Sequence, residues 1–378
     1  MISLGLSSAD QKLFERSLYS GYNLKVTCQI LDLNHKYISD VSSQLVDGQV
    51  NYAYLEPITY SASMTLLDPD NLVGFDTSSP SDNALYADRM IRIVYSVYSA
   101  LLPKWVDVPI FCGPVTKVKR DDVLLSVECQ GKESLVYEPT LAWTAKTYRK
   151  GTKGVSAIRD LMASKAGETK FDLPGFGYTL GRDYNLTGET VMWTFAKSLA
   201  GSTDLRQLFY DGRGVLRLRE TPTQPVFTFT ENHLTSVPKL DYNHADIRNG
   251  VRVVGEPNTL RAYRYLPSTH PSSPTALGRN GVKRHIMTLV EDTDLTTQSA
   301  VNATAQKLID AQATGEVGFE FDSFPIPHLE PGDIFHLSTR DASINLRLRE
   351  YSIPLRAGAQ SNGTIKKLSF NRARLRRR

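Results

Sequence analysis

The stretch from Asp241 to Gly255 constrains the fold most, because it separates two β-rich parts of the 378-residue chain. Its first half is polar and favours turns. Asn249-Gly250 is the dipeptide that best tolerates a positive φ, and it precedes a strand-like run over residues 251–254. We therefore expect a turn at Asn249-Gly250 that sets the strand register at the entrance to a second β-module.

The part before this boundary has the pattern of an antiparallel β-structure. Ser7-Ser8-Ala9-Asp10 is expected to cap a short helix that ends at Gly21, and short alternating segments then follow at the spacing of a sandwich or barrel. Gly113 is expected at a bulge or a close backbone approach. The expected strands cover residues 24–30, 49–52, 60–67, 91–98, 111–118 and 123–129, with a loop at 76–83.

From about Tyr148 the apolar period changes from two residues to that of a helix. The spacing predicts a helix over residues 155–162 that Gly167 follows, and a second helix with Thr187 as its cap and Gly201 at its end. A hairpin over residues 205–219, with Asp211-Gly212 at its turn, follows. Together these elements form an α+β unit of roughly ninety residues, within the usual range for a domain.

Beyond the boundary, residues 263–284 read as a loop, residues 299–313 as a helix, and Pro325–Asp333 as a rigid approach to a turn. Strands are expected at residues 319–324, 334–338, 346–353 and 364–370. Because single cores rarely exceed ~250–300 residues, we expect several domains. The predicted fold is a β-rich α+β chain with a first β-module at 1–147, an α+β insert at 148–240 and a second β-module at 241–378.

Charge is concentrated at one end of the chain. The formal net charge is +4, but residues 365–378 hold seven Lys or Arg and no acid. Without those seven, 37 basic residues face 40 acidic ones, which leaves a body of about −3. The pattern argues against a dedicated nucleic-acid-binding domain. The tail is either a solvated terminus or a contact to phosphate or an acidic protein surface, and it lacks the aromatic residues of a stacking platform.

The cysteine content indicates a protein made in a reducing cytoplasm. The cysteines Cys28, Cys112 and Cys129 are odd in number and fall in expected strands, so we expect buried free thiols. No apolar run approaches the ~20 residues of a membrane span, and no leader pattern is visible, so no membrane anchor is expected.

The strongest candidate for a metal site is the set His328, Glu330, Asp333 and His336, which proline residues flank. The spacing matches no established ligand pattern, and Pro-Gly-Asp is also a typical turn between strands. The sequence lacks a phosphate-binding glycine loop, a nucleophile elbow and paired-cysteine motifs. We therefore expect no catalytic, metal or cofactor residues.

Acid–base pairs for glycoside cleavage can be drawn from Glu128, Glu133, Asp183 and Asp211, but such pairs occur by chance among 40 acidic residues. Asp121-Asp122 and Asp211-Gly212 are expected in hairpin turns, where Asp binds its own backbone. His233 and His244 lie in polar connecting sequence without a nucleophile at a suggestive spacing.

The order of several segments resembles that of tail hub proteins, the central baseplate proteins of long-tailed bacteriophages and related injection machines. Each motif alone is common, and their order carries the resemblance. In order, the segments are Phe111–Val118 with Gly113-Pro114-Val115, a helix-rich insert, the hairpin Tyr210-Asp211-Gly212-x-Gly214-x-Leu216, Asp246-Ile247-Arg248-Asn249-Gly250-Val251-Arg252-Val253, a helix, and Leu329-Glu330-Pro331-Gly332-Asp333.

The resemblance implies a structural virion protein without enzymatic activity or cofactor. It implies two similar antiparallel β-barrel modules per chain and a homotrimer that forms a pseudo-sixfold ring at the tail tip. Such a ring joins the sixfold tail tube or distal tail protein to a threefold central fibre or spike. It surrounds the channel for the tape measure protein and, transiently, double-stranded DNA during genome ejection. The protein would be made in the bacterial host cytoplasm and function in the virion.

Two other classes remain open from the residues: a tail-associated cell-wall hydrolase and a receptor-binding tail protein. The first lacks a positioned acid–base pair, and the second is at odds with the internal helices. Two expected strands are candidates for sheet edges that pair between subunits: Ile91–Tyr98 and Val251–Val254. The alternative is that each pairs within its own module.

Overall fold

A computed structural model describes the chain except residues 55, 69–71, 74–83, 87–88, 138–144, 188–189, 201–205, 243–247, 267–284, 293–294, 313–316, 341, 356–367 and 373–378. Packing divides it into two compact units, Met1–Pro238 with Phe321–Ser369 and Lys239–Glu320 with Phe370–Arg378. Many strands in several sheets accompany the helices, so the β-rich α+β class is confirmed. The three-domain division and the expectation of two similar barrels stay predictions.

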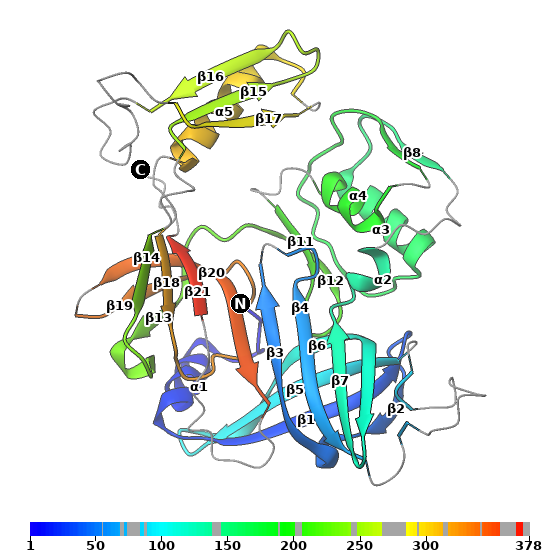
Figure 1. The fold of residues 1–378 in the computed structure, drawn as a ribbon, viewed down its shortest axis with the longest axis vertical. Helices are drawn as coiled ribbons and strands as arrows, with labels where there is room; N and C mark the ends of the chain where they lie inside the picture. The colour runs from blue at the N-terminus through cyan, green and yellow to red at the C-terminus, as the bar shows by residue number, and fades with distance from the viewer. Residues whose placement is uncertain are drawn as a thin grey trace. The chain divides into compact units, whose positions relative to one another are not determined.

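The first unit is built on a large antiparallel sheet with the strand order β20-β3-β4-β7-β6-β5-β1-β2 (Figure 1). In β1, buried apolar side chains such as Val26 and Ile30 alternate with more exposed ones, which confirms the strand expected at residues 24–30. The strands are β1 (Asn23–Asp32), β2 (Tyr37–Asp40), β3 (Leu45–Ala53), β4 (Tyr60–Leu67), β5 (Arg89–Ser99), β6 (Leu102–Asp121), β7 (Leu124–Gln130) and β20 (Ser343–Pro354). A short 3₁₀ turn, η1 (Ser42–Gln44), precedes β3.

Strand β6 is the corner of this sheet. Its first part, up to Pro114, pairs with β5, and its last part, from Val115, pairs with β7. Gly113 stands at the change of partner, and a Cβ built there would lie 1.9 Å from the carbonyl oxygen of Gln130. The register shifts between Val115 and Lys117. The close approach expected at Gly113 is confirmed, and it lets one long strand serve two partners.

Replacing Gly113 by Ala is therefore expected to lower the free energy of unfolding by about 1–3 kcal/mol, because the methyl group must displace main chain. Gly181→Ala is the matched control, since a Cβ there meets no atom within 4 Å. Thermal unfolding of both variants checks this. Equal melting temperatures for the two variants would contradict the described corner.

The inserted α+β segment has its own apolar core around two helices. Helix α3 (Gly154–Ala166) buries Ile158 and Leu161 and ends at the left-handed Gly167, as predicted. Helix α4 (Met192–Leu199) begins after Val191, so the cap predicted at Thr187 is wrong; Thr187 instead shares a hydroxyl hydrogen bond with Thr190. The predicted end at Gly201 lies outside the described residues. The remaining elements are α2 (Ser134–Tyr137), β8 (Lys146–Tyr148), β9 (Phe171–Asp172), β10 (Tyr184–Leu186), β11 (Arg206–Tyr210) and β12 (Leu216–Glu220).

A further part of the first unit surrounds strand β13 (Pro225–Thr230), which runs parallel to β19 (Ile334–Ser338). Strand β19 also pairs antiparallel with β20, which attaches β13 to the large sheet. The short 3₁₀ turn η3 (Glu231–His233) follows β13. Helix α1 (Ser8–Ser20) is capped by the Ser7 side chain, within the stretch predicted as its cap, and it buries Phe14 and Leu18.

The second unit contains β15 (Gly250–Val254) between β16 (Arg261–Tyr265) and β17 (Met287–Glu291). Helix α5 (Gln298–Gln312) confirms the helix expected at residues 299–313 and packs Val301 and Ala305 against β15. Strand β16 occupies the start of the predicted loop 263–284, of which residues 267–284 lie outside the described residues. The unit also contains β14 (Lys239–Tyr242) paired with β18 (Val317–Phe321), and the final strand of the chain is β21 (Leu368–Arg372).

The positive-φ turn predicted at Asn249-Gly250 is wrong. Neither residue has a positive φ, and Gly250 is already the first residue of β15. The Asn249 side chain is buried, and its Oδ1 accepts a hydrogen bond from the backbone N–H of Ile286 at 2.7 Å. The polar side chain thus aligns β15 with the chain entering β17, which a turn-forming dipeptide pattern does not reveal.

The predicted sheet edges are also wrong. Strand β5, which contains Ile91–Tyr98, pairs with β1 on one side and β6 on the other. Strand β15, which contains Val251–Val254, lies between β16 and β17. Both strands pair within their own sheets because their strongly apolar sequences suit central positions.

Candidate interaction site

Glu330 and Asp333, from the candidate metal set, are fully buried and bind cationic groups. Arg219 Nη1 lies 3.0 Å from Glu330 Oε2 and 3.0 Å from Asp333 Oδ1. Arg217 Nη1 lies 2.6 Å from Glu330 Oε1, and the Met1 amine lies 3.1 Å from Glu330 Oε2 and 2.6 Å from Asp333 Oδ2. Burial acts to raise the pKa of Glu330, but these positive charges outweigh it and hold the pKa below its usual range.

This ion cluster follows from strand periodicity. In β12, Leu216 and Leu218 face the core of the insert, so Arg217 and Arg219 project from the opposite face. Arg219 Nη2 also donates to the carbonyl oxygen of Pro331 at 2.7 Å. All four carboxylate oxygens of Glu330 and Asp333 have a partner, so arginines and an amine hold the positions that a metal ion would require. The cluster fastens the insert to the turn that precedes β19.

The two histidines of the candidate set lie apart from this cluster. His328 is buried and meets the Phe14 ring edge to face, with the two ring centres 5.3 Å apart. Its Nε2 lies 3.6 Å from Glu15 Oε1. His336 Nδ1 lies 2.7 Å from Asn345 Oδ1. Within the described ranges, no group of three or more His, Cys, Asp or Glu residues is placed to hold a metal ion.

A second buried polar group joins the insert to the large sheet. Lys132 Nζ lies 2.6 Å from Glu168 Oε2, 3.1 Å from His35 Nε2 and 3.3 Å from the carbonyl oxygen of Gly214. Burial, with the charge of Lys132, lowers the pKa of His35 to about 4. His35 is therefore neutral near pH 7, and its uncharged ring can sit beside the ammonium group.

Glu133, one of the four carboxylates considered from the sequence, has the pKa of a general acid. Burial raises the pKa of Glu133 to about 7, although its Oε1 accepts a hydrogen bond from the backbone N–H of Tyr210 at 3.3 Å. Catalytic acids have pKa values in this range. Glu133 is 0% exposed, however, so a polymeric substrate has no access to its carboxyl group.

The other candidate residues have local structural partners. Glu128 forms an exposed pair with Lys117, and Asp183 accepts a hydrogen bond from the backbone N–H of Lys150. Asp211 accepts N–H bonds from two residues of its own turn, which confirms the turn role expected for it. His233 Nδ1 lies 3.1 Å from the backbone nitrogen of Thr230 and caps η3, and His244 lies outside the described residues.

The expectation of buried, free cysteines is confirmed. All three thiols are buried and unpaired. Burial raises the pKa of Cys28 to about 12 and that of Cys112 to about 11. These groups stay protonated and unreactive near neutral pH. Among the described residues, no helix is long and apolar enough to cross a membrane.

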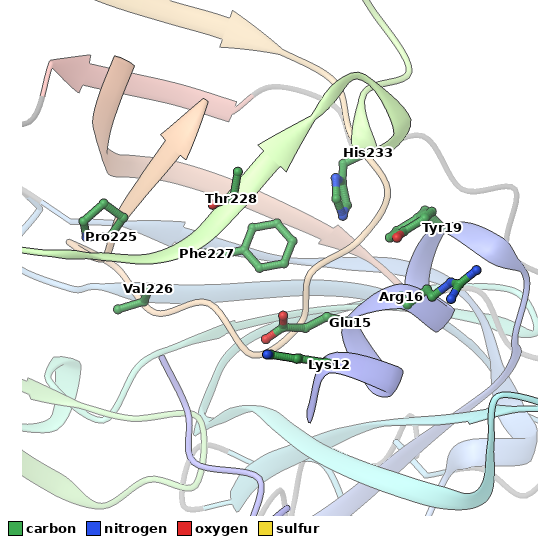
Figure 2. A pocket seen from close by; sticks show the side chains of 9 residues that line it. All are labelled: Lys12, Glu15, Arg16, Tyr19, Pro225, Val226, Phe227, Thr228 and His233. Atoms are coloured by element: carbon green, nitrogen blue, oxygen red, sulfur yellow. The ribbon is translucent and has the colours of Figure 1, made fainter. Parts of the chain in front are cut away.

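The candidate interaction site is a groove of about 350 Å³ between α1 and β13 (Figure 2). Tyr19 and His233 stack edge to face at one end, with ring centres 4.5 Å apart. Burial lowers the pKa of His233, so its imidazole is neutral near pH 7. The lining residues are Lys12, Glu15, Arg16, Tyr19, Pro225, Val226, Phe227, Thr228 and His233.

The groove follows the backbone edge of β13. Side chains of a strand alternate between its faces, so four consecutive lining residues, 225–228, indicate that main chain forms part of the wall. The sequence does not reveal this site, because its two walls are about two hundred residues apart and neither has a motif. The open edge of β13 depends on strand pairing, which a single sequence does not show.

No protein-family model matches the chain. No curated protein matches its sequence either. Among solved structures, the tail protein from Neisseria meningitidis MC58 matches with a TM-score of 0.60 at 11% identity, over 92% of this chain and 96% of that one. The 43 kDa tail protein of prophage MuSo2 from Shewanella oneidensis gives 0.59 at 10% identity, over 93% and 98%. Prophage tail protein gp18 from Listeria monocytogenes EGD-e gives 0.54 at 8% identity, over 91% and 94%. The chain therefore shares the fold of these tail proteins.

Proposed function

We propose that this chain is a structural phage tail protein, the tail hub at the tail tip. Its fold matches those of three tail proteins over more than 90% of both chains in each comparison, and this observation carries the proposal. The order of segments from Phe111 to Asp333 supports the hub assignment in particular. The buried ion cluster at Glu330 and Asp333 suits a rigid scaffold, because its carboxylates are paired with cations of the same chain.

In this role three chains form a homotrimeric ring. Each chain contributes two similar β-modules, so the ring presents six similar positions to the tail tube or distal tail protein and three to the central fibre or spike. The ring surrounds the channel for the tape measure protein and DNA. A body charge of about −3 suits such a channel, since a lining rich in Lys and Arg would retain DNA.

Light scattering of the purified chain, alone and with the distal tail protein of the same phage, tests the assignment. We expect a mass of three chains, either free or on assembly. A monomer that joins no tail protein would contradict the hub role. A zymogram on host cell wall separates the hub from a hydrolase, and we expect no lysis band because Glu133 is inaccessible.

A further inference from the structure

In the large sheet, two described strands of the first unit have an open edge. Strand β2 pairs only with β1, and β13 pairs only with β19 among the described strands. An open edge exposes unpaired N–H and C=O groups that can add another strand. Figure 1 shows β2 and β13 on opposite sides of this unit, so one chain cannot join its own two edges.

Strand β2 presents apolar side chains at its open edge. Tyr37 is 54% exposed and Ile38 is 40% exposed, and successive side chains face opposite sides, so apolar surface is open on both faces. Edge strands in soluble proteins are normally short, charged or covered. Strand β2 is short, but its apolar side chains indicate that another surface covers it.

The groove beside β13 matches strand β2 in length and charge. Four consecutive residues of β13 line the groove, and β2 has four residues. Lys12 and Arg16 lie on α1 along the groove, and within the described structure neither forms an ion pair. Strand β2 ends in the exposed Asp40. Glu15, the acid of the groove, already accepts a hydrogen bond from Gln11 Nε2 at 3.0 Å.

We propose that β2 of one copy adds to the open edge of β13 of a second copy, with Asp40 beside Lys12 and Arg16. The contact joins two different surfaces, so it repeats head to tail, and in the proposed trimer the third copy closes the ring. The inference rests on the proposed hub trimer and names the surfaces that join its subunits. A partner strand in the groove also covers the apolar faces of Tyr37 and Ile38.

The test uses one lysine substitution on each surface, because lysine on a strand edge opposes further pairing. Thr228→Lys alters only the groove and Ile38→Lys only β2, and both side chains are exposed. Val237→Lys, at a residue that is 82% exposed, is the control with the same change of charge. We expect the control to stay trimeric and each of the other two variants to lose the trimer.

Mixing the two variants gives the sharper result. Thr228→Lys retains an intact β2 and Ile38→Lys retains an intact groove, so an equimolar mixture is expected to form a dimer with one working interface. Mass photometry distinguishes one, two and three chains, and formation of the mixed dimer shows that both variants are folded. If both variants stay trimeric like wild type, the edge contact is wrong and the hub role stands. A wild type that stays monomeric with its tail partners contradicts both.

A second measurement locates the contact directly. A chain carrying both Ile38→Cys and Thr228→Cys is expected to form covalent oligomers with a short bismaleimide, which alkylates one thiol on each copy. Either substitution alone should give none, because the three native cysteines are buried. Equal cross-linking in the single and double variants would overturn the assignment.

Discussion

Replacing Arg219 by Met is expected to lower the free energy of unfolding by about 3 kcal/mol or more. The side chain is 13% exposed and binds two carboxylates that are 0% exposed. Removing it leaves Asp333 Oδ1 without its arginine partner and removes one of the two donors to the carbonyl oxygen of Pro331, the other being Gln207 Nε2. Urea unfolding at pH 7, followed by intrinsic fluorescence, measures the loss.

Lys117→Met is the control for this prediction, because it removes a cation from an ion pair whose side chains are 63% and 55% exposed. Exposed pairs contribute about 1 kcal/mol or less. A similar loss of stability in both variants would show that Arg219 acts as an ordinary surface residue. Proteolysis between the insert and β19 should also accelerate in the Arg219 variant, since the cluster joins these segments.

The second large effect concerns Glu133 and pH. Its pKa is about 7 in the folded protein, against 4.5 for an ordinary Glu, because burial disfavours the carboxylate. The folded state therefore binds more protons than the unfolded state between these values. The contribution of Glu133 to stability is fully present below pH 4.5 and is lost as the pH rises through about 7. The shift in pKa corresponds to a change of about 3 kcal/mol in the free energy of unfolding.

Glu133→Gln should remove this pH dependence, because the amide keeps the acceptor for the Tyr210 N–H and carries no charge at any pH. At pH 8 the variant is expected to be more stable than wild type, and the stability difference between the proteins should shrink toward pH 5. Thermal unfolding over this range measures it. Glu128→Gln, in an exposed pair, should leave the profile unchanged. A parallel shift of the Glu133→Gln curve at all pH values would contradict a titrating buried acid.

Elements that depend on local periodicity were predictable from the sequence. The stripe through Val301, Ala305 and Ile309 predicted α5, and the alternation through Val26 and Ile30 predicted β1. Gly113 was predictable as a close approach because a lone glycine within a strand pattern usually marks a bulge or a neighbouring backbone. In each case the physical cause lies within a few residues of its effect.

Features that depend on distant partners were not predictable in this way. The pattern Leu216-Arg217-Leu218-Arg219 showed an amphipathic strand, but the carboxylates that bind its arginines lie more than a hundred residues further along the chain. Asn249 had the sequence of a turn residue, and its burial and bond to Ile286 only arise once β15 and β17 are adjacent. Which strands form sheet edges likewise depends on pairing across the whole unit.

The proposed hub role requires that three copies of this chain form a ring at the tail tip. Electron microscopy of phage particles, with an antibody fragment bound to this protein, can count and locate these copies. We expect three fragments around the tail axis at the junction between the tube and the central fibre. Label along the tube, on the side fibres or on the capsid, or a single copy at the tip, would contradict the hub assignment.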